Sequence, residues 1–78
     1  MNVVIYTKSG CVNCDRAKQL LKSKRLSAQE IDIEQDKAAA SDLVRDHPSA
    51  RQMPQIFIDG QRVGGLAGLQ AALKQVGL

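Results

Sequence analysis

The sequence predicts an α/β fold in which a four-stranded mixed sheet is flanked by three helices, in the order β-α-β-α-β-β-α. Three short apolar runs have the length and composition of strands, and stretches with helical spacing of apolar residues lie between and after them. An Asp-Gly pair after the third run is a strong signal for a two-residue hairpin turn. Because the chain has only 78 residues, we expect one domain spanning 1–78.

The first half of the chain is predicted to form a strand, a helix and a second strand, at 3–6, 15–24 and 30–33. The first strand is a nearly continuous apolar run, as expected for a strand that is covered on both faces. The helix carries Ala17, Leu20 and Leu21 on one stripe, with Lys and Arg on the opposite side. The second strand alternates acidic and apolar residues, which indicates that one of its faces is buried. The right-handed crossover rule makes these two strands parallel neighbours.

A second helix is predicted in the middle of the chain. Its apolar face consists of four residues at helical spacing, namely Ala39, Ala40, Leu43 and Val44. His47-Pro48 should end this helix, because the residue before a proline is disfavoured in the helical conformation.

A hairpin and a last helix are predicted to complete the fold. Residues 55–58 form the third strand, and Asp59-Gly60 turns the chain into a short antiparallel fourth strand at 61–63. After Gly64-Gly65, apolar residues recur at helical spacing at Leu66, Leu69, Leu73 and Val76. Helices are therefore expected on both faces of the sheet.

The strongest chemical signal is Cys11-Val12-Asn13-Cys14, which contains both cysteines and lies where the first strand gives way to the first helix. Such a pair at the start of a helix is typical of a redox-active dithiol. The first N–H groups of a helix have no partner and its dipole is positive there, so a thiolate is stabilised. We expect Cys11 to be exposed and to attack disulfides. Cys14 lies one turn further along the apolar stripe, so it should be more buried and should resolve the mixed disulfide.

Metal binding is the competing interpretation of the cysteine pair. A structural zinc site needs four ligands, whereas the chain offers two cysteines and one distant histidine, His47. We therefore assign no metal site within the chain. A dimer that shares an iron–sulfur cluster through Cys11 of each subunit, aided by external thiols, stays open as an alternative, as does an inert cysteine pair.

The charges are unevenly distributed along the chain. Six of the eleven Lys and Arg residues lie between 8 and 25, whereas six of the eight acidic residues lie between 30 and 46. Both the basic group and the acidic group are explained if these residues simply form the solvent-exposed faces of helices. Alternatively, Lys8 and Arg16 favour a thiolate between them and attract anionic thiols or acidic partners. Nucleic-acid binding is not expected, because the only aromatic residues, Tyr6 and Phe57, lie in predicted strands.

Two dipeptides are further candidates for the site. Met53-Pro54 precedes the third strand, where a strand-entry proline is common. After an upstream cysteine pair in this topology we expect a cis peptide instead, which places the backbone of Met53 beside Cys11 to pair with an incoming chain. Gly64-Gly65 is either a simple turn or a place where a thiol ligand approaches the backbone. Residues 64–68 do not match a dinucleotide fingerprint, so no nicotinamide cofactor is indicated.

In combination these motifs resemble the glutaredoxins, over about 3–73. The similar segments occur in order along the chain: Tyr6-Thr7-Lys8, Cys11 to Cys14, Arg16-Ala17-Lys18, 53–60 and Gly64-Gly65. The resemblance implies a thioredoxin fold, Cys11 as nucleophile, Cys14 as resolving thiol and a cis Pro54. It also implies glutathione as co-substrate rather than a tightly bound cofactor, held along the backbone of Met53 with Lys8 and Arg51 near its glycyl carboxylate. The other residues that we assign to this site are Val12, Asn13, Gln52, Gly64 and Gly65.

Three segments depart from the usual glutaredoxin pattern. Val12-Asn13 replaces Pro-Tyr, Gln52-Met53 replaces Thr-Val, and Leu66-Ala67-Gly68 replaces aspartates that hold the γ-glutamyl end of glutathione. The first two departures resemble the glutaredoxin-like redoxins, which take electrons from thioredoxin reductase and pass them to ribonucleotide reductase. The Ser-Gly-Phe-Arg-Pro stretch of those redoxins is missing here. Thioredoxin reductase and ribonucleotide reductase are therefore alternative partners to glutathione and disulfide-containing proteins.

The expected setting is a reducing cytoplasm, in which the protein acts in electron transport and cell redox homeostasis as a monomer. We expect no signal peptide, because Met1 leads directly into strand residues. The apolar stretches are too short to span a membrane, so no membrane partner is expected.

Overall fold

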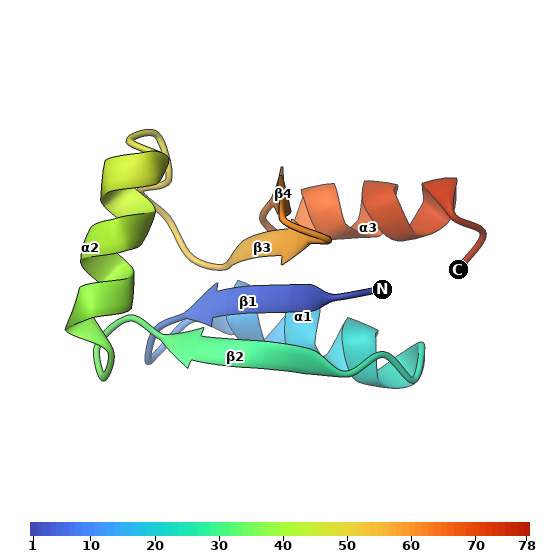
Figure 1. Ribbon diagram of the computed structural model, residues 1–78. Helices are drawn as coiled ribbons and strands as arrows, with labels where there is room; N and C mark the ends of the chain where they lie inside the picture. Colours follow the sequence, from blue (N-terminus) through green and yellow to red (C-terminus); the bar gives the residue numbers. More distant parts are fainter.

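The computed structural model describes residues 1–78, and its elements follow the predicted order (Figure 1). They are β1 (Val3–Thr7), α1 (Val12–Ser23), β2 (Ala28–Asp32), α2 (Lys37–Asp46), β3 (Gln55–Ile58), β4 (Gln61–Gly64) and α3 (Leu66–Gln75). The strands form one sheet in the order β2-β1-β3-β4. Strands β1 and β2 are parallel, whereas β3 is antiparallel to β1 and to β4. The predicted four-stranded mixed sheet with three helices is confirmed.

One face of the sheet carries the hydrophobic core. Alternation along β1 directs Val3 and Ile5 to this face, where they lie opposite Ile58 and Ile56 of β3. Helix α1 lies behind β1 and β2 in Figure 1, and it contacts α3. The two helices add four buried side chains to the cluster: Ala17, Leu21, Leu69 and Leu73. This packing fixes the start of α1 at the end of the sheet where β1 ends.

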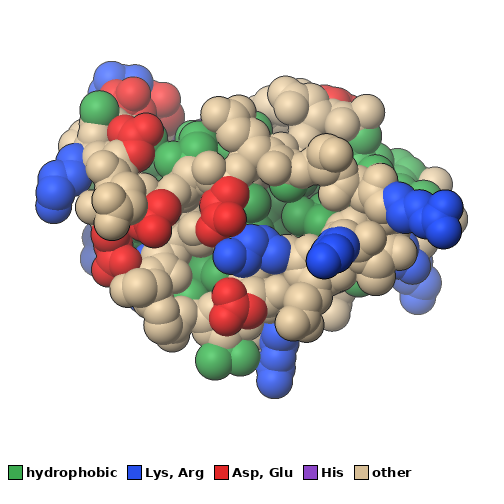
Figure 2. Space-filling view, turned by 90° about the horizontal axis from the view of Figure 1, so that it is seen from below, with side chains coloured by type: hydrophobic (Ala, Val, Ile, Leu, Met, Phe, Trp, Pro, Cys, Tyr) green, Lys and Arg blue, Asp and Glu red, His purple; other side chains and the backbone are tan.

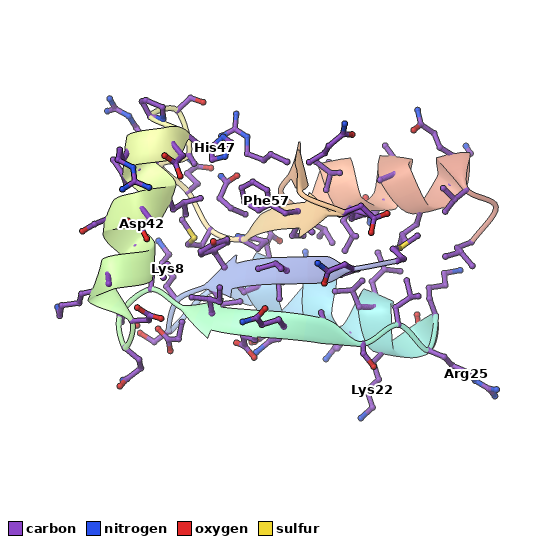
Figure 3. All side chains as sticks on the ribbon, in the orientation of Figure 1. Lys8, Lys22, Arg25, Asp42, His47 and Phe57 are labelled. Atoms are coloured by element: carbon purple, nitrogen blue, oxygen red, sulfur yellow. A yellow bond between two sulfur atoms is a disulfide. The ribbon has the colours of Figure 1, made fainter.

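The second face of the sheet is only partly covered. Val4 and Tyr6 are half-buried and alternate with fully buried neighbours, so β1 is covered completely on one face and only partly on the other. Helix α2 crosses the left end of the sheet in Figure 1, and one helix of 10 residues cannot cover four strands. Its last turn leads to His47, whose ring centroid lies 5.1 Å from that of Phe57 on β3 (Figure 3). Phe57 in turn makes an edge-to-face contact with Tyr6.

Several predicted boundaries differ from the structure. Helix α1 begins at Val12 rather than at 15, because the Cys11 side chain caps it. Strand β2 covers Ala28–Asp32 rather than 30–33, because Ala28 and Gln29 pair with β1 although they lack an apolar alternation. Strand β2 lies at the edge of the sheet and has a neighbour on one side only. Its start is therefore defined by backbone pairing with β1 and not by burial of its side chains.

Two valines that were expected on buried stripes are exposed. Val44 is 57% exposed, because α2 buries only Leu43 fully. Val76 is 58% exposed, because α3 ends at Gln75 and Val76 is its C-terminal cap. The predicted end of α2 is correct, since His47 is its C-terminal cap.

The hairpin and the last helix depend on glycine. Asp59 and Gly60 both have positive φ angles, 51° and 83°, as a two-residue turn of type I′ requires. Helix α3 then packs so closely on β4 that a Cβ atom at Gly68 would overlap the carbonyl oxygen of Val63. Gly68 therefore has a packing role that its sequence context did not indicate.

Candidate active site

The two cysteines form a disulfide at the N-terminus of α1, with their Cα atoms 5.2 Å apart. Cys11 is the N-cap residue, and the backbone N–H of Cys14 donates a hydrogen bond of 3.0 Å to its Sγ atom. A cap in this position normally uses the oxygen of Ser, Thr, Asp or Asn. Here a sulfur satisfies one of the four free N–H groups of the helix, and it lies where the helix dipole is positive.

The two sulfurs differ in exposure, but both are less exposed than expected. Cys11 is 9% exposed and Cys14 is 1% exposed. The expectation of an openly exposed Cys11 is therefore wrong, although the order of the two is as predicted. Cys11 is covered from the side by the segment before β3, since its Sγ atom lies 3.5 Å from the carbonyl oxygen of Met53.

The Met53-Pro54 peptide bond is cis, as the sequence predicted. It brings the backbone of Met53 to Cys11, although the two residues are 42 positions apart in the sequence. Gly65, the N-cap of α3, lies against the other side of the same segment, where a Cβ atom would be 3.5 Å from the carbonyl oxygen of Pro54. Gly64 has a φ of 100°, a conformation that favours glycine. Gly64 thus ends β4 and Gly65 starts α3, and Gly65 contacts the cis-proline segment.

The remaining predicted site residues lie on the surface around the disulfide. Val12 and Asn13 follow Cys11 in the first turn of α1, and Val12 is 62% exposed. Lys8 lies in the loop between β1 and Cys11, and Figure 3 shows it at the end of the sheet near α2. Arg51 and Gln52 are exposed in the segment that precedes Met53. The fold thus gathers residues from three separate segments at one end of the sheet.

Sequence reasoning missed two carboxylates that hold the surroundings of the site. The backbone N–H of Ser9 donates a 2.9 Å hydrogen bond to Glu34, which ties the loop before Cys11 to the residues after β2. The pKa of Glu34 is below its usual value, because the Ser9 side chain and, to a lesser degree, this backbone N–H donate hydrogen bonds to the carboxylate. Glu30 accepts hydrogen bonds from the buried Thr7 hydroxyl at 2.8 Å and from Lys18 at 3.1 Å. The sequence held no signal for either, because the partners are 12 to 25 positions apart.

The charged side chains are unevenly distributed on the surface of the molecule, as they are along the sequence. In Figure 2 acidic side chains gather over the left part of the molecule, whereas the right half carries mainly Lys and Arg. The left part is the end that holds α2 (Figure 1). Figure 3 shows Lys22 and Arg25 on the side of the molecule away from α2, where they point outward.

The structure has neither a cluster of potential metal ligands nor a helix suited to span a membrane. Nowhere do three or more His, Cys, Asp or Glu side chains converge in a way that could hold a metal ion. None of the three helices combines the length and the apolar character that crossing a bilayer would need.

A disulfide at the start of a helix, a cis-proline segment against it and this four-stranded sheet together define a thioredoxin-fold thiol–disulfide oxidoreductase. Comparison with known proteins assigns the chain to one family within this class. The family model "Glutaredoxin" matches residues 3–63, and the chain belongs to the glutaredoxin family. It is thus a glutaredoxin-like enzyme of the dithiol type.

Individual relatives agree with this assignment. Glutaredoxin 3 of Escherichia coli is 43% identical over 77 residues, which cover 99% of this chain and 92% of that protein. The thioredoxin-like protein BC3987 superposes with a TM-score of 0.81 at 31% identity, over 96% of this chain and 99% of its own. A buckwheat glutaredoxin–glutathione complex superposes with a TM-score of 0.79 at 25% identity, over 95% of this chain and 69% of its own.

Proposed function

We propose that Cys11 is the nucleophile of this oxidoreductase, that Cys14 resolves the intermediate, and that glutathione restores the reduced enzyme. The observation that carries the assignment of the two sulfurs is the hydrogen bond from the Cys14 N–H to Cys11 Sγ. After reduction, this donor and the helix dipole favour a thiolate on Cys11 over one on Cys14. Cys11 is also the more accessible of the two sulfurs.

The reaction proceeds by two thiol–disulfide exchanges. The Cys11 thiolate attacks one sulfur of a substrate disulfide, so that a mixed disulfide forms and the other substrate sulfur leaves as a thiolate that takes up a proton. Cys14 then loses its proton and attacks Cys11 Sγ, which releases the second substrate thiol. The two electrons that reduce the substrate come from the two cysteines, which end in the disulfide seen here. Two molecules of glutathione reverse these steps and leave as glutathione disulfide.

Glutathione is proposed from the family and from the surroundings of Cys11. The carbonyl group of Met53 faces the sulfur and offers an acceptor to an extended peptide. Lys8 and Arg51 are exposed cations at the same end of the fold and are suited to a carboxylate. The buckwheat relative was crystallised as a glutathione complex. We further propose that the chain acts on protein disulfides as a monomer in a reducing cytoplasm.

Paired coupled assays test this proposal. One assay supplies glutathione, glutathione reductase and NADPH with a glutathione mixed disulfide as substrate, and the other supplies thioredoxin reductase and NADPH. We expect turnover in the first. A flat trace there, with rapid NADPH oxidation in the second, would make the chain a reductase-fed redoxin, and the glutathione assignment would be wrong. Anaerobic reconstitution with iron and sulfide checks the cluster-bridged dimer, which is excluded if only a colourless monomer forms.

A further inference from the structure

A pocket of about 390 Å³ opens between α2 and the segment that precedes β3. Its walls are mostly apolar and include Leu43 and Val44 of α2, together with Ile33. Val44 is 57% exposed, so part of this apolar wall is open to solvent. The exchange chemistry proposed above uses Met53 and Arg51 at the edge of this pocket, but it does not use the apolar face of α2.

Met53 connects the pocket with the disulfide. Its carbonyl oxygen lies 3.5 Å from Cys11 Sγ, and the same residue lines the pocket. An extended chain rises about 3.3 Å per residue, so a substrate that pairs along Met53 reaches the pocket within one or two residues of its reacting cysteine. Peptide recognition of this kind takes its affinity from main-chain bonds and its specificity from pockets for side chains.

We infer that this pocket selects polypeptide substrates with a bulky apolar side chain within two residues of the cysteine that is reduced. The inference rests on the proposed function, because it places the substrate along Met53. The volume of the pocket is in the range of small-ligand sites, and its apolar wall favours an aliphatic or aromatic side chain. The one charged residue of the lining is Arg51, which is exposed, so a neighbouring carboxylate is favoured over an ammonium group.

Small peptide disulfides measure this preference directly. The reference probe is the symmetric disulfide of a pentapeptide with cysteine at its centre and glycine at the other four positions. In each of four further probes, a single leucine replaces one of these four glycines. Symmetric disulfides place the same peptide on Cys11 whichever sulfur is attacked. The readout is the second-order rate constant for oxidation of the pre-reduced enzyme, followed by rapid quenching with an alkylating agent and mass spectrometry.

We expect at least one leucine peptide to react about tenfold faster than the all-glycine peptide, since burying most of a leucine side chain is sufficient for that factor. In the best peptide, a glutamate next to the leucine raises the rate further and a lysine there lowers it. The variant Val44→Lys should bring the ratio of leucine to glycine rates to about one. Val76→Lys is the matched control, because Val76 is equally exposed but lies at the end of α3, and it should keep the full ratio.

The outcomes separate this inference from the function on which it rests. Equal rates for all leucine and glycine peptides, or an unchanged ratio in Val44→Lys, would overturn the inference while leaving the exchange chemistry in place. A better rate with lysine than with glutamate beside the leucine would overturn the role of Arg51. If neither the all-glycine disulfide nor glutathione disulfide oxidises the enzyme, the proposed function itself fails.

Discussion

The backbone N–H of Cys14 donates a 3.0 Å hydrogen bond to Cys11 Sγ, so the first cysteine caps the helix that carries the second. One contact therefore has two roles. It satisfies a helix N–H that would otherwise lack a partner, and it places a donor where negative charge develops on Cys11 when the disulfide is reduced. The local structure and the chemistry of the site share the same atoms.

In the reduced protein, this donor and the helix dipole should hold the pKa of the Cys11 thiol below that of a free cysteine. The ultraviolet absorbance of the thiolate, followed against pH in the reduced protein, measures it. Cys14→Ser assigns the transition to Cys11, because Cys11 is then the only thiol. A transition at the pH of a free thiol in that variant would remove the basis for the nucleophile assignment.

The two cysteines should differ sharply on substitution. Cys11→Ser should abolish turnover of every disulfide substrate, since a hydroxyl is a far weaker nucleophile at neutral pH. Cys14→Ser should keep attack on glutathione mixed disulfides within about tenfold of the parent but should trap mixed disulfides with protein substrates. The glutathione-coupled assay and mass spectrometry of the trapped species distinguish these results. The reverse pattern would exchange the two roles.

A carboxylate at the start of α3 should improve the use of glutathione. Glutaredoxins, which this chain resembles, usually carry aspartates at the segment that is Leu66-Ala67-Gly68 here. Ala67 is exposed in the first turn of α3, where an acidic side chain is also favoured by the helix dipole. Ala67→Asp should lower KM for glutathione by roughly threefold to tenfold, as expected for one charge-assisted contact in partial contact with solvent.

The control is Gln70→Asp, which adds the same charge to an exposed position one turn further along the helix. It should leave KM for glutathione unchanged. Equal improvement in both variants would indicate a general charge effect instead of a contact at the start of the helix.

Gly68 should tolerate no side chain. A Cβ atom there would overlap the backbone carbonyl of Val63, and a backbone group cannot move aside as a flexible side chain can. Gly68→Ala should therefore lower the free energy of unfolding by about 1–3 kcal/mol, although alanine is the better helix former. Urea denaturation measures the difference.

Gly77→Ala provides the comparison. Gly77 has a φ of 81° and open space around its Cβ position, so its substitution should cost only about 1 kcal/mol, for the left-handed backbone alone. If both variants unfold at the same urea concentration, the approach of α3 to β4 is not the cause.

Glu30 should contribute a pH-dependent part of the stability. The hydrogen bond from Thr7, followed by the bond from Lys18, holds the pKa of Glu30 below its ordinary value of 4.5. At a pH between the pKa of Glu30 in the folded protein and its higher pKa in the unfolded chain, the unfolded state binds more protons than the folded state. The free energy of unfolding therefore rises with pH in this range. The contribution is fully present above 4.5 and is lost as the pH falls through the lower folded value. Because both partners of the ion pair are about 40% exposed, solvent reduces it to less than about 1 kcal/mol.

Urea denaturation of the parent and of Glu30→Gln at neutral and at acidic pH tests this contribution. The parent should lose more stability on acidification than the variant does, because the variant has no proton to bind at this position. An identical loss in both proteins would show that the Thr7–Glu30–Lys18 contacts do not depend on the carboxylate charge.

Local sequence determined most of the architecture. Apolar runs, helical spacing and the Asp59-Gly60 turn gave the element order and the hairpin, because these patterns depend on backbone conformation and on burial of one face. The cysteine pair gave the nature of the site, since its chemistry depends on a spacing of three residues and on a helix start. The expected cis bond before Pro54 required the topology as well as the dipeptide.

Tertiary packing decided what no local pattern could show. The low exposure of Cys11 comes from Met53, which lies 42 positions away and contacts it only after β3 has paired with β1. The requirement for Gly68 arises from the distance between α3 and β4, and the exposure of Val44 arises from how little of α2 rests on the sheet. Each depends on the distance between elements that are separate in sequence. Spacing within a segment predicts which side of a helix or strand is apolar. Only the packing of the elements against one another decides which residues cover that side and how close they lie to it.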